Sequence, residues 1–330
     1  MSRMDKQYKN MLKCILETGT NTVGHAVRPH WEDGQPAHTK KIFGYINRFD
    51  LRAEFPILTI REVPVYRCLD EILWIYQKKS NNIRDLHSHI WDSWADEGGS
   101  IGKAYGYQIR QEFPFLAETY LTIPENIENV CKNYDVETSI AFLRQLDEYE
   151  KIKRIRPELP PRGVRLWKGA DQMDAVLYDL KHNPFSRSII INMYNHHDLY
   201  AMNLRPCAYS VTFNVTDEGF DKPILNMLLN MRSCDTVVAG GWNVAQYAFF
   251  QMMVAQVSDM IPGQFIQVIA DAHIYDRHIL IADELLEREE YPAPKVTLDP
   301  DIKDFYQFTT DSITVTDYKY GERIKIPVAI

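Results

Sequence analysis

The fold is decided by the stretch between residues 207 and 275, which contains CAYSVTFNV at 207–215, NVAQYAFFQMMVAQV at 243–257 and FIQVIADAHIY at 265–275. The first and last of these segments follow the two-residue period in polarity that is typical of strands, which predicts two β-strands. The segment between them is apolar nearly all round, a pattern typical of a buried helix. Strands arranged about a central buried helix favour an α+β fold, with a mixed or antiparallel sheet, over alternating βαβ units.

The flanking sequence adds further elements around this centre. Helices are expected where apolar residues recur at helical spacing, at 5–17 and 68–77, and in the charged run 276–290. Strands or extended segments are expected at 42–49, 57–60, 223–231 and 312–330, and residues 29–36, which contain proline and glycine, are expected to form a loop.

The composition excludes several classes of protein. With 330 residues, of which 45% are hydrophobic, the chain can bury a real core and is not expected to be disordered. Its formal charge of −8 offers no basic surplus for general nucleic-acid binding. Five scattered cysteines without a CxxC pair indicate a reduced intracellular setting. No apolar run is long enough to span a membrane and no secretory signal is present, so we expect a soluble cytoplasmic protein.

We expect a single domain over residues 1–330 that carries an insertion at about 111–170. This part of the sequence has the least regular pattern, and its prolines Pro157, Pro160 and Pro161 are flanked by charged residues. An insertion explains it better than a domain boundary, because the segments before and after it depend on each other.

Cys207 is a candidate nucleophile. Arg187, Arg205 and Arg232 lie in neighbouring sequence elements, and a cation near sulfur favours the reactive thiolate. Arg232 and Ser233 together offer a guanidinium and a hydroxyl, which suit a phosphate. The alternative is a buried structural cysteine beside a solvated surface pair.

Other polar and aromatic residues also have both a chemical and a structural interpretation. Glu71, among apolar helical positions, is either a surface residue or a buried carboxylate with a raised pKa, suited to proton transfer. His273 and Tyr275 share a strand face and either hydrogen-bond a sugar or belong to the core. Trp91 and Trp94 either stack on a flat ring or fill the core.

Two further patterns do not predict sites. EGGSIGKA at 97–104 is close to a phosphate loop, but its first glycine is misplaced and Ala104 stands where a Ser or Thr would hold magnesium. The adjacent His196 and His197 would point apart, and no Cys/His set has zinc spacing, so we expect no metal.

Taken in order along the chain, the candidate residues resemble those of the thymidylate synthase family. The motifs that carry the resemblance are Glu71 in DEILWIYQ, Trp91 and Trp94 in IWDSWADE, Tyr105 in AYGYQ, Cys207 in RPC, Arg232 to Asp235 in MRSCD, Asn243 in WN, His273 and Tyr275 in DAHIY, and the terminal PVAI. Each motif alone is weak, but the ordered set is specific. It covers most of the chain and is weakest through 111–170.

The resemblance implies a homodimer that methylates the uracil of dUMP, with 5,10-methylenetetrahydrofolate as one-carbon donor and reductant. In this interpretation the Cys207 thiolate, supported by Arg232, adds to C6 of uracil and makes C5 nucleophilic. Glu71 relays protons through water, and Tyr105 assists removal of the C5 proton. Asn243 reads the uracil edge, because its amide can both donate and accept.

The resemblance also implies which residues bind the two ligands. The dUMP phosphate is expected to contact Arg28, Arg232 and Ser233, and Arg187 reaching in from the partner subunit. The sugar 3′-hydroxyl is expected to contact His273 and Tyr275. The folate is expected to contact Arg61, Trp91, Trp94, Asp235 and Ile330, whose carboxylate closes the site against water.

The sequence departs from the family pattern at four places. Ser188 stands where the family usually has a second arginine, so one phosphate contact from the partner is expected to be missing. Ala208 follows the nucleophile where His is common. Residues 239–243 read Ala239-Gly240-Gly241-Trp242-Asn243 in place of Gly-x-Pro-Phe-Asn, and Arg61 stands where Lys commonly meets the folate tail. These changes leave a different nucleotide preference open.

Two other functions are open at this point. A hydroxymethylase of the same fold, acting on dUMP or dCMP, would let water rather than hydride quench the exocyclic methylene intermediate. Trp94 and the terminal PVAI favour hydride transfer, because both help to exclude water. A non-catalytic nucleotide-binding dimer would account for Ser188, Ala208 and the altered turn, but Cys207 and Glu71 argue against it.

Overall fold

The computed structural model describes residues 2–119 and 163–330, and the chain divides into two compact units. The first unit comprises Met1–Ile109 and Arg187–Ile330, and the second comprises Arg110–Ser186. Every residue predicted to act in catalysis or binding belongs to the first unit. Residues 120–162 of the expected insertion, with its three prolines, lie outside the described residues. The single domain with an insertion therefore stays a prediction.

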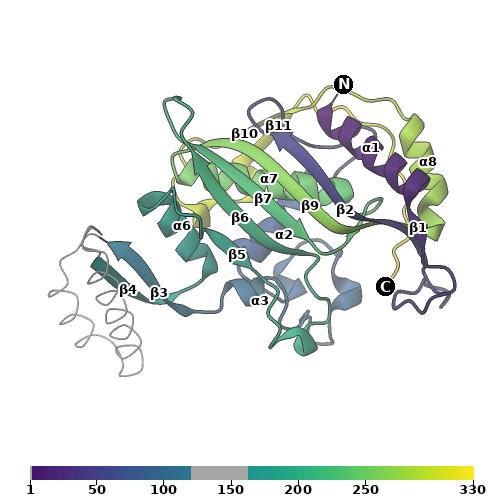
Figure 1. Ribbon diagram of the computed structural model, residues 1–330, viewed down its shortest axis with the longest axis horizontal. Coiled ribbons are helices and arrows are strands. Elements are labelled where there is room, and N and C mark those ends of the chain that lie inside the picture. Colours follow the sequence, from purple (N-terminus) through teal and green to yellow (C-terminus); the bar gives the residue numbers. More distant parts are fainter. Residues whose placement is uncertain (1, 120–162) are drawn as a thin grey trace, which may run out of the picture. The chain divides into compact units, whose positions relative to one another are not determined.

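The first unit is built on a mixed sheet (Figure 1). The strands of this sheet are β1 (Thr20–Asn21), β2 (Thr39–Asp50), β5 (Ile190–Asn192), β6 (Ala208–Thr216), β7 (Ile224–Met231), β8 (Cys234–Asp235) and β9 (Ile261–Tyr275). They lie in the order β1-β2-β9-β7-β6-β5, and β8 also pairs with β9. β9 runs parallel to β7 and β8, while the other pairs are antiparallel. The predicted α+β fold with a mixed sheet is confirmed.

Helix α7 (Gly240–Val257) is the crossover that connects the parallel strands β7 and β9. The helix is apolar nearly all round, and most of its residues are buried. The predicted buried helix at 243–257 is therefore confirmed, although it begins earlier, at Gly240. Gly241 permits this start, because a Cβ at that position would lie 2.2 Å from Cδ1 of Leu58.

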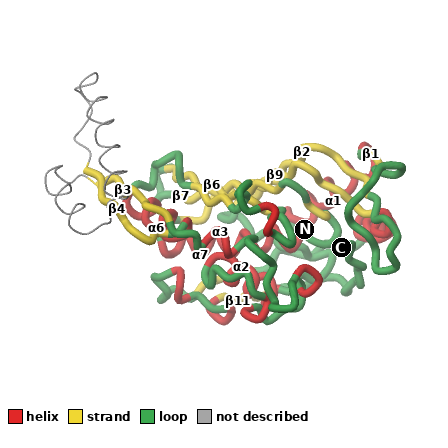
Figure 2. Tube along the Cα trace, turned by 90° about the horizontal axis from the view of Figure 1, so that it is seen from below, coloured by secondary structure: helices red, strands yellow, loops and turns green. Residues whose placement is uncertain are grey.

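The two faces of the sheet differ in their surroundings. One cross-strand row is buried, and it consists of Asn47, Gln267, Leu229, Val211 and Ile191. Figure 2 shows helices α2 (Val65–Tyr76) and α7 on one side of this layer of strands. Successive side chains of a strand alternate between faces, and the adjacent row consists of Arg48, Ile266, Leu228, Thr212 and Ile190. No member of that second row is buried in the single chain.

The remaining elements agree with most of the sequence expectations. The first unit also contains α1 (Arg3–Thr18), α3 (Gly106–Ile109), α8 (Ile279–Glu287) and the antiparallel pair β10 (Lys295–Leu298) and β11 (Ile313–Thr316). The second unit contains β3 (Phe113–Thr119) paired with β4 (Gly163–Ala170), and α6 (Gln172–His182). Short 3-10 helices occur at Ile83–Asp85, Asp92–Trp94, Leu199–Ala201, Asp276–His278, Phe305–Gln307 and Thr310–Ser312. Within 312–330, which we expected to be extended, only β11 is a regular strand. No described helix has both the length and the apolarity needed to cross a membrane.

The strand predicted at 57–60 is wrong. Ile57, Leu58 and Ile60 are fully buried, but their segment joins no sheet. The carboxylate of Asp5, on α1, instead accepts hydrogen bonds from the backbone amides of Thr59 (2.8 Å) and Ile60 (3.4 Å). The apolar pattern indicates the burial correctly. It cannot reveal that a distant side chain supplies the bonds that a neighbouring strand would otherwise make.

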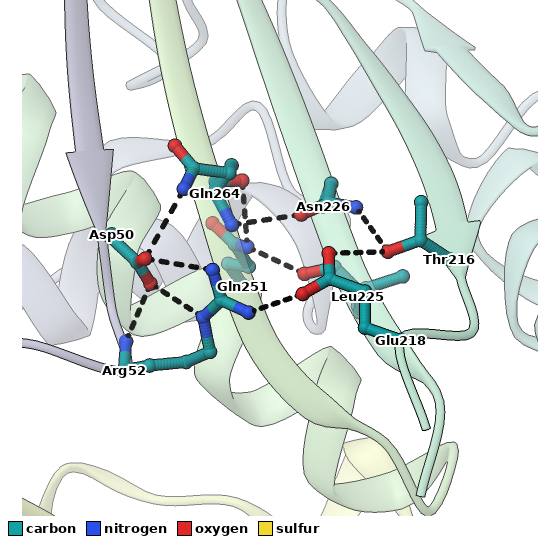
Figure 3. A network of polar contacts seen from close by, with 8 residues as sticks. All are labelled: Asp50, Arg52, Thr216, Glu218, Leu225, Asn226, Gln251 and Gln264. Atoms are coloured by element: carbon teal, nitrogen blue, oxygen red, sulfur yellow. Dashed lines mark hydrogen bonds and ion pairs between the residues drawn. The ribbon is translucent and has the colours of Figure 1, made fainter. Parts of the chain in front are cut away.

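A polar network stabilises one end of the sheet (Figure 3). Arg52 forms an ion pair with Asp50 at 2.8 Å. Gln251, which is buried on α7, donates to the backbone carbonyls of Leu225 (2.8 Å) and Gln264 (3.1 Å), next to a shift in the register of β7 and β9. Buried carbonyls at such an irregularity need partners, so this glutamine has a structural role.

Candidate active site

The paired ends of β6 and β7 bring Cys207 and Arg232 together. Cys207 directly precedes β6, and Arg232 directly follows β7. Nη2 of Arg232 lies 3.5 Å from Sγ of Cys207. The same guanidinium donates to the backbone carbonyls of Pro206 (3.1 Å) and Arg205 (2.7 Å), so the backbone fixes its position beside the sulfur.

This guanidinium alone does not ionise the sulfur. Burial raises the pKa of the Cys207 thiol, and the positive charges of Arg232 and Arg28 lower that pKa by less. The net direction of the pKa is upward. The arginine–sulfur contact expected from the sequence is present, and the burial of the sulfur opposes the thiolate that Arg232 favours.

Tyr105 contacts the candidate nucleophile directly. The backbone N–H of Cys207 donates to the hydroxyl of Tyr105 at 3.1 Å, and the ring of Tyr105 packs edge to face on Trp91, with centroids 5.0 Å apart. Tyr105 has a φ of 48°, a left-handed conformation that a non-glycine residue adopts only where its surroundings hold it. Burial raises the pKa of the Tyr105 hydroxyl, so this group is neutral at physiological pH.

Glu71, on α2, is a buried carboxylate bound by three side-chain N–H groups. Trp91 donates to Oε1 at 2.7 Å, and Trp242 and Gln246 donate to Oε2 at 2.6 and 2.8 Å. Burial raises the pKa of the Glu71 carboxyl, and these hydrogen bonds oppose the rise. Of the two interpretations of Glu71 that the sequence allowed, the buried carboxylate with a raised pKa is confirmed.

A chain of amides connects Asn243 to this carboxylate. Both Asn243 and Gln246 lie in the first turns of α7, three residues apart, and therefore project from the same side of the helix. Nδ2 of Asn243 donates to Oε1 of Gln246 at 3.4 Å, and Nε2 of Gln246 donates to Glu71. Sequence reasoning missed Gln246, although its spacing from Asn243 was a signal that could have found it.

Three arginines surround a cavity of about 480 Å³. The cavity is lined by Arg28, Arg205, Arg232, Tyr194, Leu199, Tyr200 and Met202. Arg28 and Arg232 were predicted to lie together and do so, and Ser233 follows Arg232 directly in the chain. Arg205 was not assigned to this site from the sequence. Arg187 is exposed and does not line the cavity within the single chain.

His273 and Tyr275, on β9, share the face predicted for them and are held by charged and aromatic neighbours. Nδ1 of His273 lies 2.8 Å from Oδ1 of Asp271, which also pairs with Lys41 at 2.7 Å. Burial opposes ionisation of Asp271, but the hydrogen bonds from His273 and Lys41 prevail and lower its pKa. The His273 ring contacts the Tyr275 ring edge to face at 5.2 Å. Burial raises the pKa of Tyr275 to about 12, so its hydroxyl stays protonated.

Two of the residues assigned to the folate stabilise the turn before α7. Arg61 donates to the carbonyls of Val237 (2.8 Å) and Val238 (3.2 Å), and Asp235 accepts from the amides of the same two residues. Their side chains therefore have structural partners that the sequence did not reveal.

The two tryptophans assigned to the folate differ from each other. Trp91 is 7% exposed and uses its indole N–H on Glu71. Trp94 is half-buried and contacts Trp91 edge to face at 5.7 Å. Trp91 therefore belongs to the core beside Glu71, whereas Trp94 is the more accessible aromatic surface.

The C-terminal residue is held against the loop that carries Arg28. Ile330 and His30 exchange two backbone hydrogen bonds, of 2.8 and 2.9 Å. Three residues before the end, the carbonyl of Pro327 lies 2.8 Å from Nε2 of the buried His278, whose Nδ1 lies 3.6 Å from Asp235. The terminus is thereby connected to the same turn that Asp235 stabilises.

Among the residues that the structure describes, no group of three or more His, Cys, Asp or Glu side chains is placed to hold a metal ion. The hydrogen-bond donors in the site are amides, indoles, hydroxyls and guanidinium groups. Such donors suit an organic anion with polar edges rather than a cation.

Comparison with known proteins gives one consistent family. The family model described as thymidylate synthase matches residues 6–330. A thymidylate synthase of Bacillus licheniformis is 35% identical over 334 aligned residues, which cover all of both chains. Thymidylate synthase 1 of Bacillus subtilis strain 168 and a thymidylate synthase of Bacillus phage phi3T are each 34% identical with the same coverage.

A solved structure agrees with these sequence relatives. Thermostable thymidylate synthase A from Bacillus subtilis is 33% identical, and its fold matches with a TM-score of 0.78 over all of both chains. The similarity thus extends over the whole length, including the part of the sequence where the motif resemblance was weakest.

Proposed function

The chain belongs to the thymidylate synthase family, and from this premise we propose which of its residues carry the reaction. The activity is the reductive methylation of dUMP to dTMP, with 5,10-methylenetetrahydrofolate as co-substrate. The relatives bear the name of this synthase, which supports the methyl product over the hydroxymethyl alternative.

The convergence of Cys207, Arg232, Tyr105 and Glu71 carries the assignment of the catalytic residues. Cys207 adds to C6 of uracil, and because the pKa of its thiol is raised, the thiol proton passes to water as the S–C6 bond forms beside Arg232. The C5–C6 π electrons move toward C5 and the C4 carbonyl, so C5 can attack the methylene carbon, whose bond to one folate nitrogen breaks. C5 then loses its proton to water with the help of Tyr105, and the bond from the methylene carbon to the second folate nitrogen breaks, which leaves an exocyclic methylene group and tetrahydrofolate. Hydride from tetrahydrofolate adds to this methylene and yields dihydrofolate, while the C5–C6 double bond re-forms and the sulfur departs as thiolate.

The direction of the amide chain supports a site for uracil. An ionised Glu71 accepts from Nε2 of Gln246, which leaves Oε1 of Gln246 to accept from Nδ2 of Asn243. Asn243 then retains one N–H and its carbonyl oxygen for the ligand. Those groups match O4 and N3–H of uracil, whereas cytosine would place its own amino donor and ring acceptor against them.

The arginine-lined cavity supports a phosphate site. Arg28 and Arg232 line it, and the hydroxyl of Ser233 lies next to Arg232 in the chain. Arg205 adds a third guanidinium to the cavity within the same chain. We assign Arg205 to phosphate binding together with Arg187 of the second subunit, and this third cation offsets the arginine that is missing at Ser188.

The remaining contacts follow from their surroundings. Asp271 holds one nitrogen of His273, so the other ring nitrogen and the Tyr275 hydroxyl are left for the sugar 3′-hydroxyl. Trp94 and the Ile330 carboxylate are assigned to the folate together with Arg61, Asp235 and Trp91. Of these, Trp94 is the half-buried ring that a pterin can stack upon.

A homodimer accounts for the partly covered face of the sheet. The row that contains Ile266, Leu228 and Ile190 is largely apolar, and Ile190 is 47% exposed in the single chain. An apolar row of this kind is typical of a protein–protein interface. A second copy packed there would also bring a second Arg187 into the assembly.

A product assay tests the function. The purified protein is incubated with dUMP and methylenetetrahydrofolate, and mass analysis is expected to show dTMP together with dihydrofolate. Cys207→Ala is expected to abolish turnover while the circular dichroism spectrum and dUMP binding are kept. A hydroxymethyl product with tetrahydrofolate would show the hydroxymethylase, and turnover by the alanine variant would contradict the role of Cys207. Binding of dUMP without any product would show the non-catalytic dimer.

A further inference from the structure

Trp242 lies next to Glu71. At position 242 the thymidylate synthase family pattern has an apolar residue, whereas tryptophan carries a polar indole N–H. The side chain is half-buried on the first turn of α7, and its indole N–H lies 2.6 Å from Oε2 of Glu71. The family pattern has Phe at this point, which has no N–H to donate. The hydrogen bond is therefore a property of this chain.

We propose that Trp242 is a positioning residue of the reaction, which holds the Glu71 carboxylate ionised and oriented so that protons enter and leave through Oε1. The proposal rests on the proposed role of Glu71 in proton transfer. It adds a residue that determines in which form, and through which oxygen, Glu71 acts.

The donor pattern around Glu71 carries this inference. Oε2 accepts from two N–H groups, those of Trp242 and Gln246, and this occupies both of its lone pairs. An indole can only donate, so a proton on Oε2 would face the indole N–H without an acceptor. Oε1 accepts from Trp91, and no second donor to it is present in the described part of the chain. The second lone pair of Oε1 is thus the position from which a proton can be exchanged.

The backbone of α7 explains why Trp242 reaches this carboxylate. Gly241 packs directly on Leu58, where a Cβ would lie 2.2 Å from Cδ1, and Gly240 lies against the ring of Tyr8. These glycines let the first turn of the helix approach its neighbours closely. The residue that follows them is consequently brought within hydrogen-bonding distance of α2.

Among the residues that the structure describes, the other titratable groups that act on Glu71 do not supply a compensating positive charge. Asp70 and Cys68 lie on the same helix, and the charge of Asp70 opposes ionisation of Glu71. Tyr105 and Tyr247 face it from the neighbouring elements, and burial raises the pKa of both hydroxyls. The ionised form of Glu71 therefore depends on its three N–H donors. Loss of one of them raises the pKa of the carboxyl.

Trp242→Phe tests the proposal, because it keeps an aromatic ring and removes only the donor. A hydrogen bond to a charged group accounts for roughly one to two pK units. The pKa that Glu71 contributes to the kcat profile is therefore expected to move upward by about one unit, and kcat on the acidic side of that pKa to fall about tenfold. The Kd of dUMP is expected to stay within about twofold, since the ring does not line the phosphate cavity. Trp242→His, which retains a ring N–H, is expected to restore most of the wild-type profile.

The matched control is Trp74→Phe. Trp74 is a buried indole whose N–H donates to the carbonyl of Asn82 at 2.9 Å, so an indole hydrogen bond is lost while all three donors to Glu71 are kept. This variant is expected to lose stability and to keep the wild-type pH profile. If Trp242→Phe also keeps the profile, or if Trp74→Phe shifts it equally, the indole of Trp242 does not position Glu71 and the proposal fails.

A direct titration separates this proposal from the proposed function. The carboxyl band of Glu71 is followed by infrared difference spectroscopy between pH 4 and 9, with Glu71→Gln subtracted, in the wild type and in both Trp242 variants. An upward shift in Trp242→Phe supports the proposal even if no dTMP is formed, and an unchanged titration overturns it even if dTMP is formed. If Trp242→Phe does not fold, the histidine variant decides: a titration more than about one unit from the wild type would contradict a donor role.

Discussion

Asp5 on α1 and Glu71 on α2 are both buried carboxylates, and each accepts three hydrogen bonds. Asp5 accepts from the Thr59 amide, the Thr59 hydroxyl and the Ile60 amide. Glu71 accepts only from side chains, namely two indoles and one amide. Burial raises the pKa of both carboxyls. By burial, hydrogen-bond number and pKa direction, the two residues are alike.

What separates the two carboxylates is the origin of their donors. Asp5 takes the place of a neighbouring strand for the segment that contains Thr59, so the fold depends on it. The donors to Glu71 are the side chains of Trp91, Trp242 and Gln246, so no backbone N–H takes Glu71 as its acceptor. Glu71 can therefore change its protonation state while the fold is maintained. A buried carboxylate bound only by side chains is suited to catalysis, and one bound mainly by backbone amides is suited to structure.

Glu71→Gln gives the largest expected effect and affects activity only. A neutral amide cannot exchange a proton, and loss of a general acid–base group costs about 10²- to 10⁴-fold in rate. We expect kcat to fall within this range. We expect the free energy of unfolding to change by less than about 1 kcal/mol, because removing a buried charge offsets the weakened hydrogen bonds. Steady-state kinetics and urea unfolding measure the two quantities. A large loss of stability with near-normal kcat would show that Glu71 has a structural role instead of a catalytic one.

Asp5→Ala gives the next largest effect and the opposite pattern. The substitution leaves the buried amides of Thr59 and Ile60 without an acceptor, at a cost of about 1–3 kcal/mol for each unsatisfied group. We expect the free energy of unfolding to fall by about 2–4 kcal/mol and kcat per folded molecule to stay within about twofold. Urea unfolding followed by fluorescence checks the first, and active-site titration with kinetics checks the second. If kcat falls as far as in Glu71→Gln, Asp5 belongs to the catalytic machinery.

The sequence allowed the elements of the core to be predicted because their signals are local. The alternation in β6 and β9 and the apolar surface of α7 depend on residues that are close together in the chain. The contact between Cys207 and Arg232 was also within reach, because adjacent strands carry the two residues. The segment at 57–60 was misassigned, since its hydrogen bonds come from Asp5, more than fifty positions away. The hydrogen bonds of Trp242 and Gln246 to Glu71 were missed for a similar reason, because Glu71 lies on another helix. The spacing of Asn243 and Gln246 indicates only that these two residues share a side of α7.

The smallest expected effect is a difference in how stability depends on pH, and Asp5→Asn measures it. Asparagine keeps the size and one acceptor oxygen of the side chain and removes its titration. The folded-state pKa of Asp5 is raised above its unfolded value, so the protonated form favours the folded state. That contribution is fully present below the unfolded pKa of about 3.9 and is lost as pH rises through the raised folded-state pKa.

The wild type should therefore lose free energy of unfolding relative to Asp5→Asn as pH rises across that window, by about 1.4 kcal/mol for each unit of pKa shift. Urea unfolding of both proteins between pH 4 and 7 gives the difference directly, and the contribution of Glu71 cancels because both proteins retain it. Parallel curves would mean that the Thr59 and Ile60 donors fully compensate the burial of Asp5. The two carboxylates would then differ in electrostatics as well as in the origin of their donors.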